Sequence, residues 1–427
     1  MGTFLAILMP LMLFMGYPFM VILIGAVLLG TMLFIPGFDL TTLVQQTLTG
    51  MKPFSLVCIP MFILAANLIT AGEAARRLIR VIKAYIGHIT GGLPVTLNAG
   101  CTLFGAVSGS TQATLAAIGA PMRPMLLEAG YSDSWTIATT IAATDMAILI
   151  PPSIGFIVYG VATATSVGKL YLAGIGPGIL LFLAYSIYCV IYSRIKKIPV
   201  LPRVSWAERW KATKEGVWLL GFPIIVIGGI YTGIFSPTEA AAASVVYALF
   251  IELVIYRSLT LRKILDALLS TGVVTAVVFL LVGGGQVFSF ILSYLQSPQH
   301  FVPQLMGANP SALRVIVIVN LVYLIACMFV DPVVAIFVLS PIFHPYVLKA
   351  GIDPVFMGVF VTLQVAIGSN TPPFGVDIFT AQLLYKKSYL TCIRNIAPFI
   401  GIDLIVNVIL IALPEISMFL PNISFGK

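Results

Sequence analysis

The stretch VFMGVFVTLQVAIGSNTPPFGVDIFTAQLLY, residues 355–385, decides the fold class of this chain. It is long and apolar enough to enter a lipid bilayer, yet the polar residues 368–371 and the pair Pro372-Pro373 interrupt it in the middle. Two successive prolines remove two amide donors and free carbonyls of the preceding turn, so a helix has to open there. Open backbone at membrane depth is tolerated only where protein or a water-filled cavity surrounds it. The stretch therefore predicts one membrane crossing made of two half-helices.

The composition of the whole chain agrees with a membrane protein. Of its 427 residues, 59% are hydrophobic and 9% are charged, whereas a soluble domain has about 25% charged residues. Apolar runs of around twenty residues without strict alternation favour helices over a β-barrel. The sequence predicts an all-α polytopic membrane protein. No nucleic-acid partner is expected, because the net charge of +8 does not come from a soluble basic module.

The two halves of the chain place several prolines and glycines at the same relative positions, 221 residues apart. The identical pairs at that offset are Pro124/Pro345, Leu127/Leu348, Ala129/Ala350, Gly130/Gly351, Pro151/Pro372, Pro152/Pro373, Ile157/Ile378 and Pro177/Pro398. The same offset places Ser110 on Asp331. Each half is thus predicted to hold one re-entrant helical hairpin, broken at 105–110 or at 330–332, followed by one broken helix.

The placement of Lys and Arg predicts the orientation. The loop 194–214 is rich in both and is expected to be cytoplasmic, because positive charge accumulates on that side. Tracing the crossings outward from this loop puts most of the 23 basic residues on the same side. The tracing also opens the first hairpin to the cytoplasm and the second to the outside, so the halves are inverted repeats. Secondary transporters use inverted repeats with broken helices to place a site near mid-membrane.

Two polar segments are the candidates for binding chemistry. Ser108-Gly109-Ser110-Thr111 is predicted at the first hairpin tip, where unpaired carbonyls and small hydroxyls can replace the water shell of Na⁺. Taken alone, this run is more typical of a small-residue packing seam. The segment 368–373 is more specific, because Asn370 and Thr371 add oxygens where the helix must open; a simple proline kink is the alternative. Its match to the break at 147–152 favours an ion site.

Three carboxylates are predicted to lie deep, and a charge at membrane depth is a functional candidate. Asp331 falls at the second hairpin tip, where it can ligate a cation or cap the returning helix. Asp145 precedes the first break, where it can cap a helix or pair with another polar group. The sequence suggests no role for Asp377. Ser236-Pro237-Thr238-Glu239 predicts a capping box, so Glu239 has a structural interpretation.

The basic segment 76–83 has helical spacing and predicts an amphipathic arm at the cytoplasmic membrane surface. No Lys or Arg stands near the predicted tips. A bound anion would therefore depend on helix N-termini, hydroxyls, amides and bound cations.

With these motifs the chain resembles the large membrane subunit of the tripartite ATP-independent periplasmic (TRAP) transporters, the DctM family, over almost its full length. The resemblance rests on Gly105-x-x-Ser108-Gly109-Ser110, Ala129-Gly130-Tyr131, Pro151-Pro152-Ser153, Gly233-x-Phe235-Ser236-Pro237-Thr238-Glu239, Asp331 and Thr371-Pro372-Pro373-x-Gly375. It implies an elevator-type, sodium-coupled importer of a small organic anion, a carboxylate or a sulfonate, in the bacterial inner membrane. It also implies two protein partners, a small four-helix membrane subunit and a periplasmic solute-binding protein.

Carried over by position, the resemblance implies two Na⁺ sites and a substrate site. The first Na⁺ site would comprise Ser108, Gly109, Ser110, Thr144 and Ile148. The second would comprise Cys327, Gly368, Ser369, Thr371 and Pro372, with Cys327 standing where relatives are expected to have glycine. The substrate would contact Ser110, Thr111, Asp331 and Asn370.

The expected organisation has four parts. Residues 1–53 are N-terminal scaffold helices, 54–193 the first half of a transport domain, 194–270 a cytoplasmic loop with scaffold helices, and 271–427 the second half of the transport domain. An intramembrane enzyme and a passive channel are the alternatives. The enzyme is disfavoured, because the chain has neither His-Glu-x-x-His nor suitably framed aspartates. Hairpins alone do not exclude a channel.

Overall fold

The computed structural model describes residues 1–307 and 310–425, and every regular element in that part is helical. The N-terminal elements are α1 (Gly2–Phe14), α2 (Phe19–Phe34), α3 (Thr41–Met51), the 3₁₀ turn η1 (Phe54–Val57), α4 (Cys58–Ala71) and α5 (Ala74–Ile86). The next group is α6 (Gly92–Ser108), α7 (Thr111–Thr114), the π-helical turn η2 (Leu115–Gly119), α8 (Ala120–Glu128), α9 (Asp133–Ala143), α10 (Met146–Leu149), α11 (Ile154–Thr163) and α12 (Val167–Ile195).

The middle of the chain forms α13 (Trp206–Gly216), η3 (Val217–Leu220), α14 (Gly221–Pro223), η4 (Ile224–Gly228), α15 (Gly229–Tyr231), α16 (Pro237–Phe250) and η5 (Ile251–Ile255). The remaining elements are α17 (Leu261–Tyr294), α18 (Ser297–Met306), α19 (Ala312–Cys327), α20 (Pro332–Lys349), α21 (Pro354–Asn370), α22 (Val376–Tyr385), α23 (Tyr389–Ile393), α24 (Ala397–Ala412) and α25 (Glu415–Phe425).

The predicted all-α membrane fold is confirmed. Six helices of the described chain are long and apolar enough to cross a membrane, or up to eight if each of two bent pairs counts as one span. One bent pair is the predicted first broken helix, in which α9–α10 and α11 meet at 45° across Pro151-Pro152. The second predicted break also falls where the prolines stand, because α21 ends at Asn370 and α22 begins at Val376.

At the positions of the two predicted hairpins, consecutive helices contact one another. The first consists of α6 and, after a turn at Gly109, the continuous run α7–η2–α8; the second consists of α19 and α20. The predicted capping box opens α16, where Ser236 N donates to Glu239 Oε2 at 2.7 Å and Glu239 N donates to Ser236 Oγ at 3.3 Å. The basic segment 76–83 forms most of α5, as expected.

Four helices were not predicted. Helix α13 lies largely in the segment 194–214, which the sequence predicted to be a loop. The short helices α3 and α18 each precede an apolar helix and are not themselves membrane spans. Helix α25 follows α24 at a 54° bend. Helix α25 packs along α12, where Gly176 lets the chain approach closely: a Cβ there would lie 1.9 Å from the carbonyl oxygen of Ile416. Short helices of this kind depend on tertiary packing and carry little periodic signal of their own.

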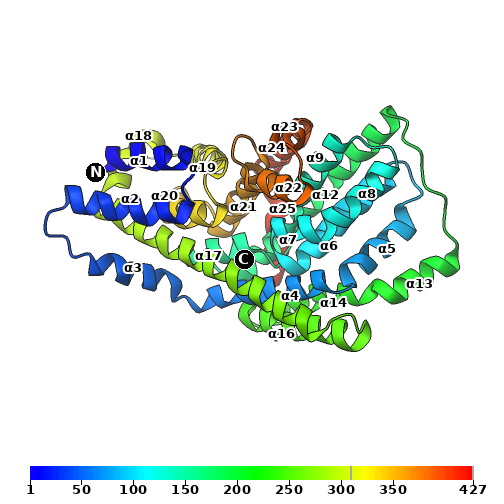
Figure 1. The fold of residues 1–427 in the computed structure, drawn as a ribbon. Coiled ribbons are helices and arrows are strands. Elements are labelled where there is room, and N and C mark those ends of the chain that lie inside the picture. The colour runs from blue at the N-terminus through cyan, green and yellow to red at the C-terminus, as the bar shows by residue number, and fades with distance from the viewer. Residues whose placement is uncertain (308–309, 426–427) are drawn as a thin grey trace.

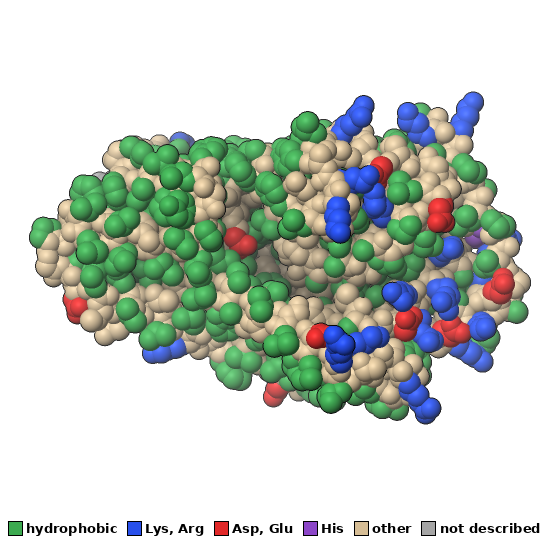
Figure 2. Space-filling model, in the orientation of Figure 1, with side chains coloured by type: hydrophobic (Ala, Val, Ile, Leu, Met, Phe, Trp, Pro, Cys, Tyr) green, Lys and Arg blue, Asp and Glu red, His purple; other side chains and the backbone are tan. Residues whose placement is uncertain are grey.

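The long helix α17 forms one side of the molecule and is flanked by α2 and α3 (Figure 1). Helix α4 packs against both α16 and α17, and α5 packs against α13 and α6. The two hairpins, the broken helices and α12 gather around the opposite side of α17 (Figure 1). On the face shown in Figure 2, Lys and Arg gather at the end formed by α5 and α13, which agrees with the predicted cytoplasmic end.

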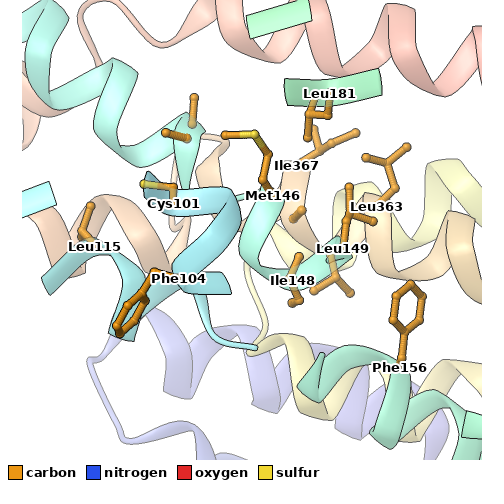
Figure 3. Packing of buried hydrophobic residues seen from close by; sticks show 14 of the residues in the cluster. Cys101, Phe104, Leu115, Met146, Ile148, Leu149, Phe156, Leu181, Leu363 and Ile367 are labelled. Atoms are coloured by element: carbon orange, nitrogen blue, oxygen red, sulfur yellow. The ribbon is translucent and has the colours of Figure 1, made fainter. Parts of the chain in front are cut away.

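The largest buried cluster joins the two halves of the chain (Figure 3). Side chains of the first hairpin and first broken helix pack beside α12 and α21 in this cluster. Those drawn with labels are Cys101, Phe104, Leu115, Met146, Ile148, Leu149, Phe156, Leu181, Leu363 and Ile367. The polar breaks described below are therefore held within a close-packed apolar surround.

Candidate functional site

The first hairpin tip is built around Gly109. Its φ of 59° lies in the left-handed region that glycine tolerates, so α6 can end and α7 can start in the reverse direction. Ser110 then caps α7, with its Oγ accepting a hydrogen bond from Ala113 N at 3.4 Å. Ser108 is fully buried, and its Oγ lies 3.1 Å from Thr114 Oγ1. The tip thus turns several hydroxyl and backbone oxygens toward one place.

This tip rests on the first helix break. A Cβ at Gly109 would lie 2.5 Å from the carbonyl oxygen of Pro152, and Ile154 N donates to the carbonyl of Gly109 at 3.3 Å. Thr144 and Ile148, which the sequence placed in the first Na⁺ site, are both buried on the same broken helix. Ile148 lines the same crevice as Ser108, Gly109 and Ser110, whereas the Thr144 hydroxyl donates to the Ile141 carbonyl of its own helix at 2.6 Å.

The second tip meets the second break in the same way. A Cβ at Gly368 would lie 2.3 Å from the Cβ of Cys327, so the end of α19 and the end of α21 touch. The hydroxyls of Ser369 and Thr371 donate to carbonyls of their own helix, at 2.8 Å to Val365 and 2.6 Å to Ile367. The lone pairs of both hydroxyl oxygens are left to accept a hydrogen bond or to bind a cation.

The two tip–break contacts occur at equivalent places in the two halves. In the first half, a Cβ on Gly105 would lie 2.4 Å from the Cα of Ala147, and in the second, Gly368 meets Cys327. Ala147 and Gly368 correspond at the 221-residue offset. Each crossing contains one glycine, on the hairpin in the first half and on the broken helix in the second. Cys327 is accommodated because the residue facing it has no side chain.

A crevice of about 480 Å³ opens between the two tips and the α4–α17 side. Its wall includes residues 108–113 of the first tip, residues 331–333 at the second tip and Ser369. Helix α17 contributes valines between 273 and 278, and α4 contributes Asn67, whose Nδ2 donates to Thr271 Oγ1 at 2.9 Å. Among the described residues that line it, Asp331 is the only charged one.

Three of the four predicted substrate contacts line this crevice, and the fourth does not. Ser110, Thr111 and Asp331 face it. Asp331 also caps α20, because its Oδ1 accepts from Val333 N at 2.9 Å, so the two predicted roles of this residue are compatible. Asn370 is buried away from the crevice lining, and its Nδ2 donates to Asp145 Oδ2.

The two halves also meet through polar contacts. Thr111 Oγ1 donates to Asp377 Oδ1 at 2.7 Å, which gives the unassigned Asp377 a partner on the first hairpin tip. The Asn370–Asp145 hydrogen bond likewise joins the second break to the first. Each of these bonds links residues that are more than 220 positions apart.

The sequence did not predict the buried acidic cluster formed by Asp145, Asp403 and Tyr185. The hydroxyl of Tyr185 contacts both Asp145 Oδ2, at 3.0 Å, and Asp403 Oδ1. All three side chains are almost completely buried, and Asp145 Oδ1 and Asp403 Oδ2 have no hydrogen-bond partner among the described residues. Asp403 stands in an otherwise apolar helix, which is the same signal that identified the other deep carboxylates.

The chain is similar to known transport proteins over its whole length. Residues 6–416 match the model of the family described as "Tripartite ATP-independent periplasmic transporter, DctM component". The ectoine/5-hydroxyectoine TRAP transporter large permease protein UehC of Ruegeria pomeroyi is 49% identical over 420 residues, which cover 98% of either chain. The ectoine TRAP transporter large permease protein TeaC of Halomonas elongata is also 49% identical, over 100% of either chain.

More distant similarity agrees with this family. The C4-dicarboxylate TRAP transporter large permease protein DctM of Pseudomonas aeruginosa is 37% identical over 86% of either chain. The crystal structure of the YdaH transporter of Alcanivorax borkumensis shares the fold, with a TM-score of 0.60 and 17% identity over 90% of this chain and 88% of that one. These relatives are permeases rather than enzymes. The chain therefore belongs to the DctM component family of the tripartite ATP-independent periplasmic transporters, as a multi-pass large permease subunit for small organic substrates.

Proposed function

We propose that this chain is the large permease subunit of a sodium-coupled importer in the bacterial inner membrane. A small membrane subunit would stabilise it, and a periplasmic solute-binding protein would deliver the substrate. The observation that carries the proposal is the meeting of both hairpin tips and both helix breaks around one crevice. Opened helix ends with free carbonyl and hydroxyl oxygens suit Na⁺, and paired breaks of this kind are used by secondary transporters.

Na⁺ binding orders each tip against its break and completes the substrate site between them. The first ion uses Ser108, Gly109 and Ser110 with backbone oxygens around Thr144 and Ile148. The second uses Gly368, Ser369, Thr371 and Pro372 with the end of α19 at Cys327. Support comes from the two close crossings, at Gly105 and at Gly368, which hold each tip on its break.

The substrate is a compact zwitterion of the ectoine type. Ectoine carries a carboxylate and a cationic cyclic amidine, whereas a C4-dicarboxylate carries two negative charges. The crevice offers Asp331 and no Lys, Arg or His from the described part of the chain. Asp331 belongs to the motifs that carry the resemblance to the whole family, so it does not by itself select ectoine. We infer that it pairs with the cationic end and that the first tip with its Na⁺ receives the carboxylate. The names of the relatives at 49% identity point to the same substrate.

The hairpins and broken helices move as one block in an elevator mechanism. Helix α17 supplies the stationary wall of the crevice, and α4 and α16 belong with it because the three helices pack together. The moving part then begins after α4 and α5 in the predicted block 54–193, and after α17 in the predicted block 271–427. This placement rests on packing contacts and makes the crevice the boundary between the moving and the stationary parts.

The test is uptake into proteoliposomes. The chain is co-reconstituted with the small subunit and the binding protein encoded beside it, and labelled ectoine is supplied with an inward Na⁺ gradient or with choline in its place. Ectoine uptake that requires Na⁺, and that excess succinate does not inhibit, is expected. Equal uptake in choline would exclude sodium coupling, and uptake of succinate instead of ectoine would exclude the zwitterion. Asp331→Asn keeps the helix cap and removes the charge, so it should weaken ectoine uptake.

A further inference from the structure

A second cavity of about 500 Å³ lies at the basic end of the molecule, and it shares no lining residue with the central crevice. Its walls come from α5, from α8 of the first hairpin, and from the segment 201–215 that leads into and through α13. Figure 2 shows that Lys and Arg gather at this end of the molecule. The cavity is therefore at the membrane surface where the predicted cytoplasmic side lies.

One side of the cavity carries positive charge that the protein does not neutralise. Of its basic residues, Arg76 pairs with Glu73 at 3.2 Å and Arg80 pairs with Glu215 at 3.0 Å. Glu208 faces inward as the capping-box residue of α13, with its Oε2 accepting from Ser205 N at 3.1 Å. Lys83 and Lys211 form no ion pair or hydrogen bond with any described residue. His88 adds a buried Nδ1 without a partner on the same wall.

The other side of the cavity is apolar. Ile79, Met125, Leu201 and Val204 line it, together with two prolines. A small soluble anion gains nothing from contact with an apolar wall, whereas an acyl chain is stabilised by burying its apolar surface there. Basic pockets between membrane helices on the cytoplasmic side are suited to anionic lipid headgroups.

Two aromatic residues place the cavity at the level of the lipid headgroups. Trp206 and Trp210 on α13 are 69% and 62% exposed, and they stand one turn apart on the helix that also carries the lining residues Glu208 and Lys211. Tryptophan collects at the membrane–water interface, where its ring contacts acyl chains and its N–H reaches water. Because α13 has about 3.6 residues per turn, both rings lie on the face opposite to the lining residues Glu208, Lys211 and Glu215, so they place α13 itself at the interface.

We propose that the cavity binds one acidic phospholipid, with its phosphate between Lys83 and Lys211 and the start of an acyl chain on the apolar wall. The lipid contacts α5 and α13 on one side and α8 on the other. In the mechanism proposed above, these elements belong to the stationary and the moving parts, so a bound lipid bridges them. The binding itself does not depend on that mechanism.

Binding of lipid to the full chain, purified in detergent, tests the proposal by native mass spectrometry. Phosphatidylglycerol is titrated against phosphatidylcholine, and inorganic phosphate serves as the free anion. Wild type should retain phosphatidylglycerol selectively, and Lys83→Ala/Lys211→Ala should weaken that binding about tenfold or more. The matched control is Lys196→Ala/Lys197→Ala, which removes two charges from the same end of the protein outside the cavity. It should bind like wild type.

A third variant tests the apolar wall. Val204→Asp introduces a negative charge at a partly exposed position and should also weaken phosphatidylglycerol binding, with the chain still eluting as a single folded species. Equal losses in the two double variants would show a general charge effect and overturn the site. Equal retention of phosphatidylcholine, or displacement of the lipid by inorganic phosphate, would overturn the acidic-lipid assignment. None of these results depends on transport, so they separate this proposal from the proposed function.

Discussion

Thr111 Oγ1 donates a hydrogen bond of 2.7 Å to Asp377 Oδ1, and this bond joins the first hairpin tip to the helix that follows the second break. Both side chains are buried, and Asp377 Oδ2 has no other partner among the described residues. A carboxylate at this depth is costly unless it is hydrogen-bonded. The bond therefore stabilises the contact between the two halves of the chain.

Thr111→Val is expected to lower the free energy of unfolding by about 1–3 kcal/mol, because it leaves the Asp377 carboxylate without its donor. Asp377→Asn is the matched control: Thr111 can still donate to the amide oxygen, and the buried charge is gone. Chemical unfolding in detergent measures both. A loss in Asp377→Asn that equals or exceeds the loss in Thr111→Val would contradict this account of the bond.

Gly368→Ala is expected to disrupt the second tip–break crossing, because the new Cβ would lie 2.3 Å from the Cβ of Cys327. Uptake should fall strongly, and the double variant Gly368→Ala/Cys327→Gly should restore only part of it, because the opposing Cβ is removed but the backbone carbon of residue 327 still lies 2.9 Å from the new Cβ. Gly272→Ala on α17 is the control, since no heavy atom lies within 4 Å of its added Cβ. Wild-type uptake in Gly368→Ala alone would show that the crossing is not close.

Tyr185→Phe removes the hydroxyl that contacts both Asp145 and Asp403. Asp403 is then left without a partner, and we expect a loss of thermal stability, since a buried acidic group without a hydrogen bond is costly. Adding Asp403→Asn to Tyr185→Phe should recover part of the loss, because it removes one of the two acidic groups. Unfolding temperatures of the single and double variants provide the measurement. No recovery in the double variant would argue against the cluster as the cause.

Glu252→Ala is expected to loosen the amphipathic helix α5. The Glu252 carboxylate accepts from Glu73 N at 3.1 Å and from Ala74 N at 2.9 Å, so a residue of η5 caps the start of α5. Hydrogen exchange of the α5 amides should become faster in Glu252→Ala and less so in Glu252→Gln, which keeps one acceptor oxygen. Glu215→Ala, which breaks only the surface pair with Arg80, should have little effect. Unchanged exchange in Glu252→Ala would contradict the capping role.

The sequence was sufficient for the features that depend on local chemistry. The prolines at 151–152 and 372–373 interrupt helices wherever the chain folds, because proline lacks the amide proton. The turn at Gly109 and the capping box at Ser236 were also predictable, because glycine tolerates a positive φ and a serine side chain accepts from the amide three residues later. The structure has all of these where the residues predicted them.

Contacts between distant parts of the chain were not predictable. Nothing in the pattern around Thr111 indicates a partner 266 residues later. The cysteine at position 327 was interpretable only once Gly368 was seen to face it, since the space at a crossing depends on both helices. A polar residue at a helix break marked Asn370 as a functional candidate, but the sequence did not show where its side chain points. In the structure it contacts Asp145 and does not line the crevice.

We propose that Na⁺ binds where each hairpin tip meets its helix break. The most direct test is the initial rate of uptake as a function of Na⁺ concentration in Ser110→Ala, Thr371→Ala and Thr371→Ser. Thr380→Ala is the control, because its hydroxyl donates to its own helix at Val376 and lies outside both sites. We expect both alanine variants at the sites to need severalfold more Na⁺ for half-maximal uptake, and Thr371→Ser and Thr380→Ala to resemble wild type. An unchanged Na⁺ dependence in Ser110→Ala and Thr371→Ala would contradict it.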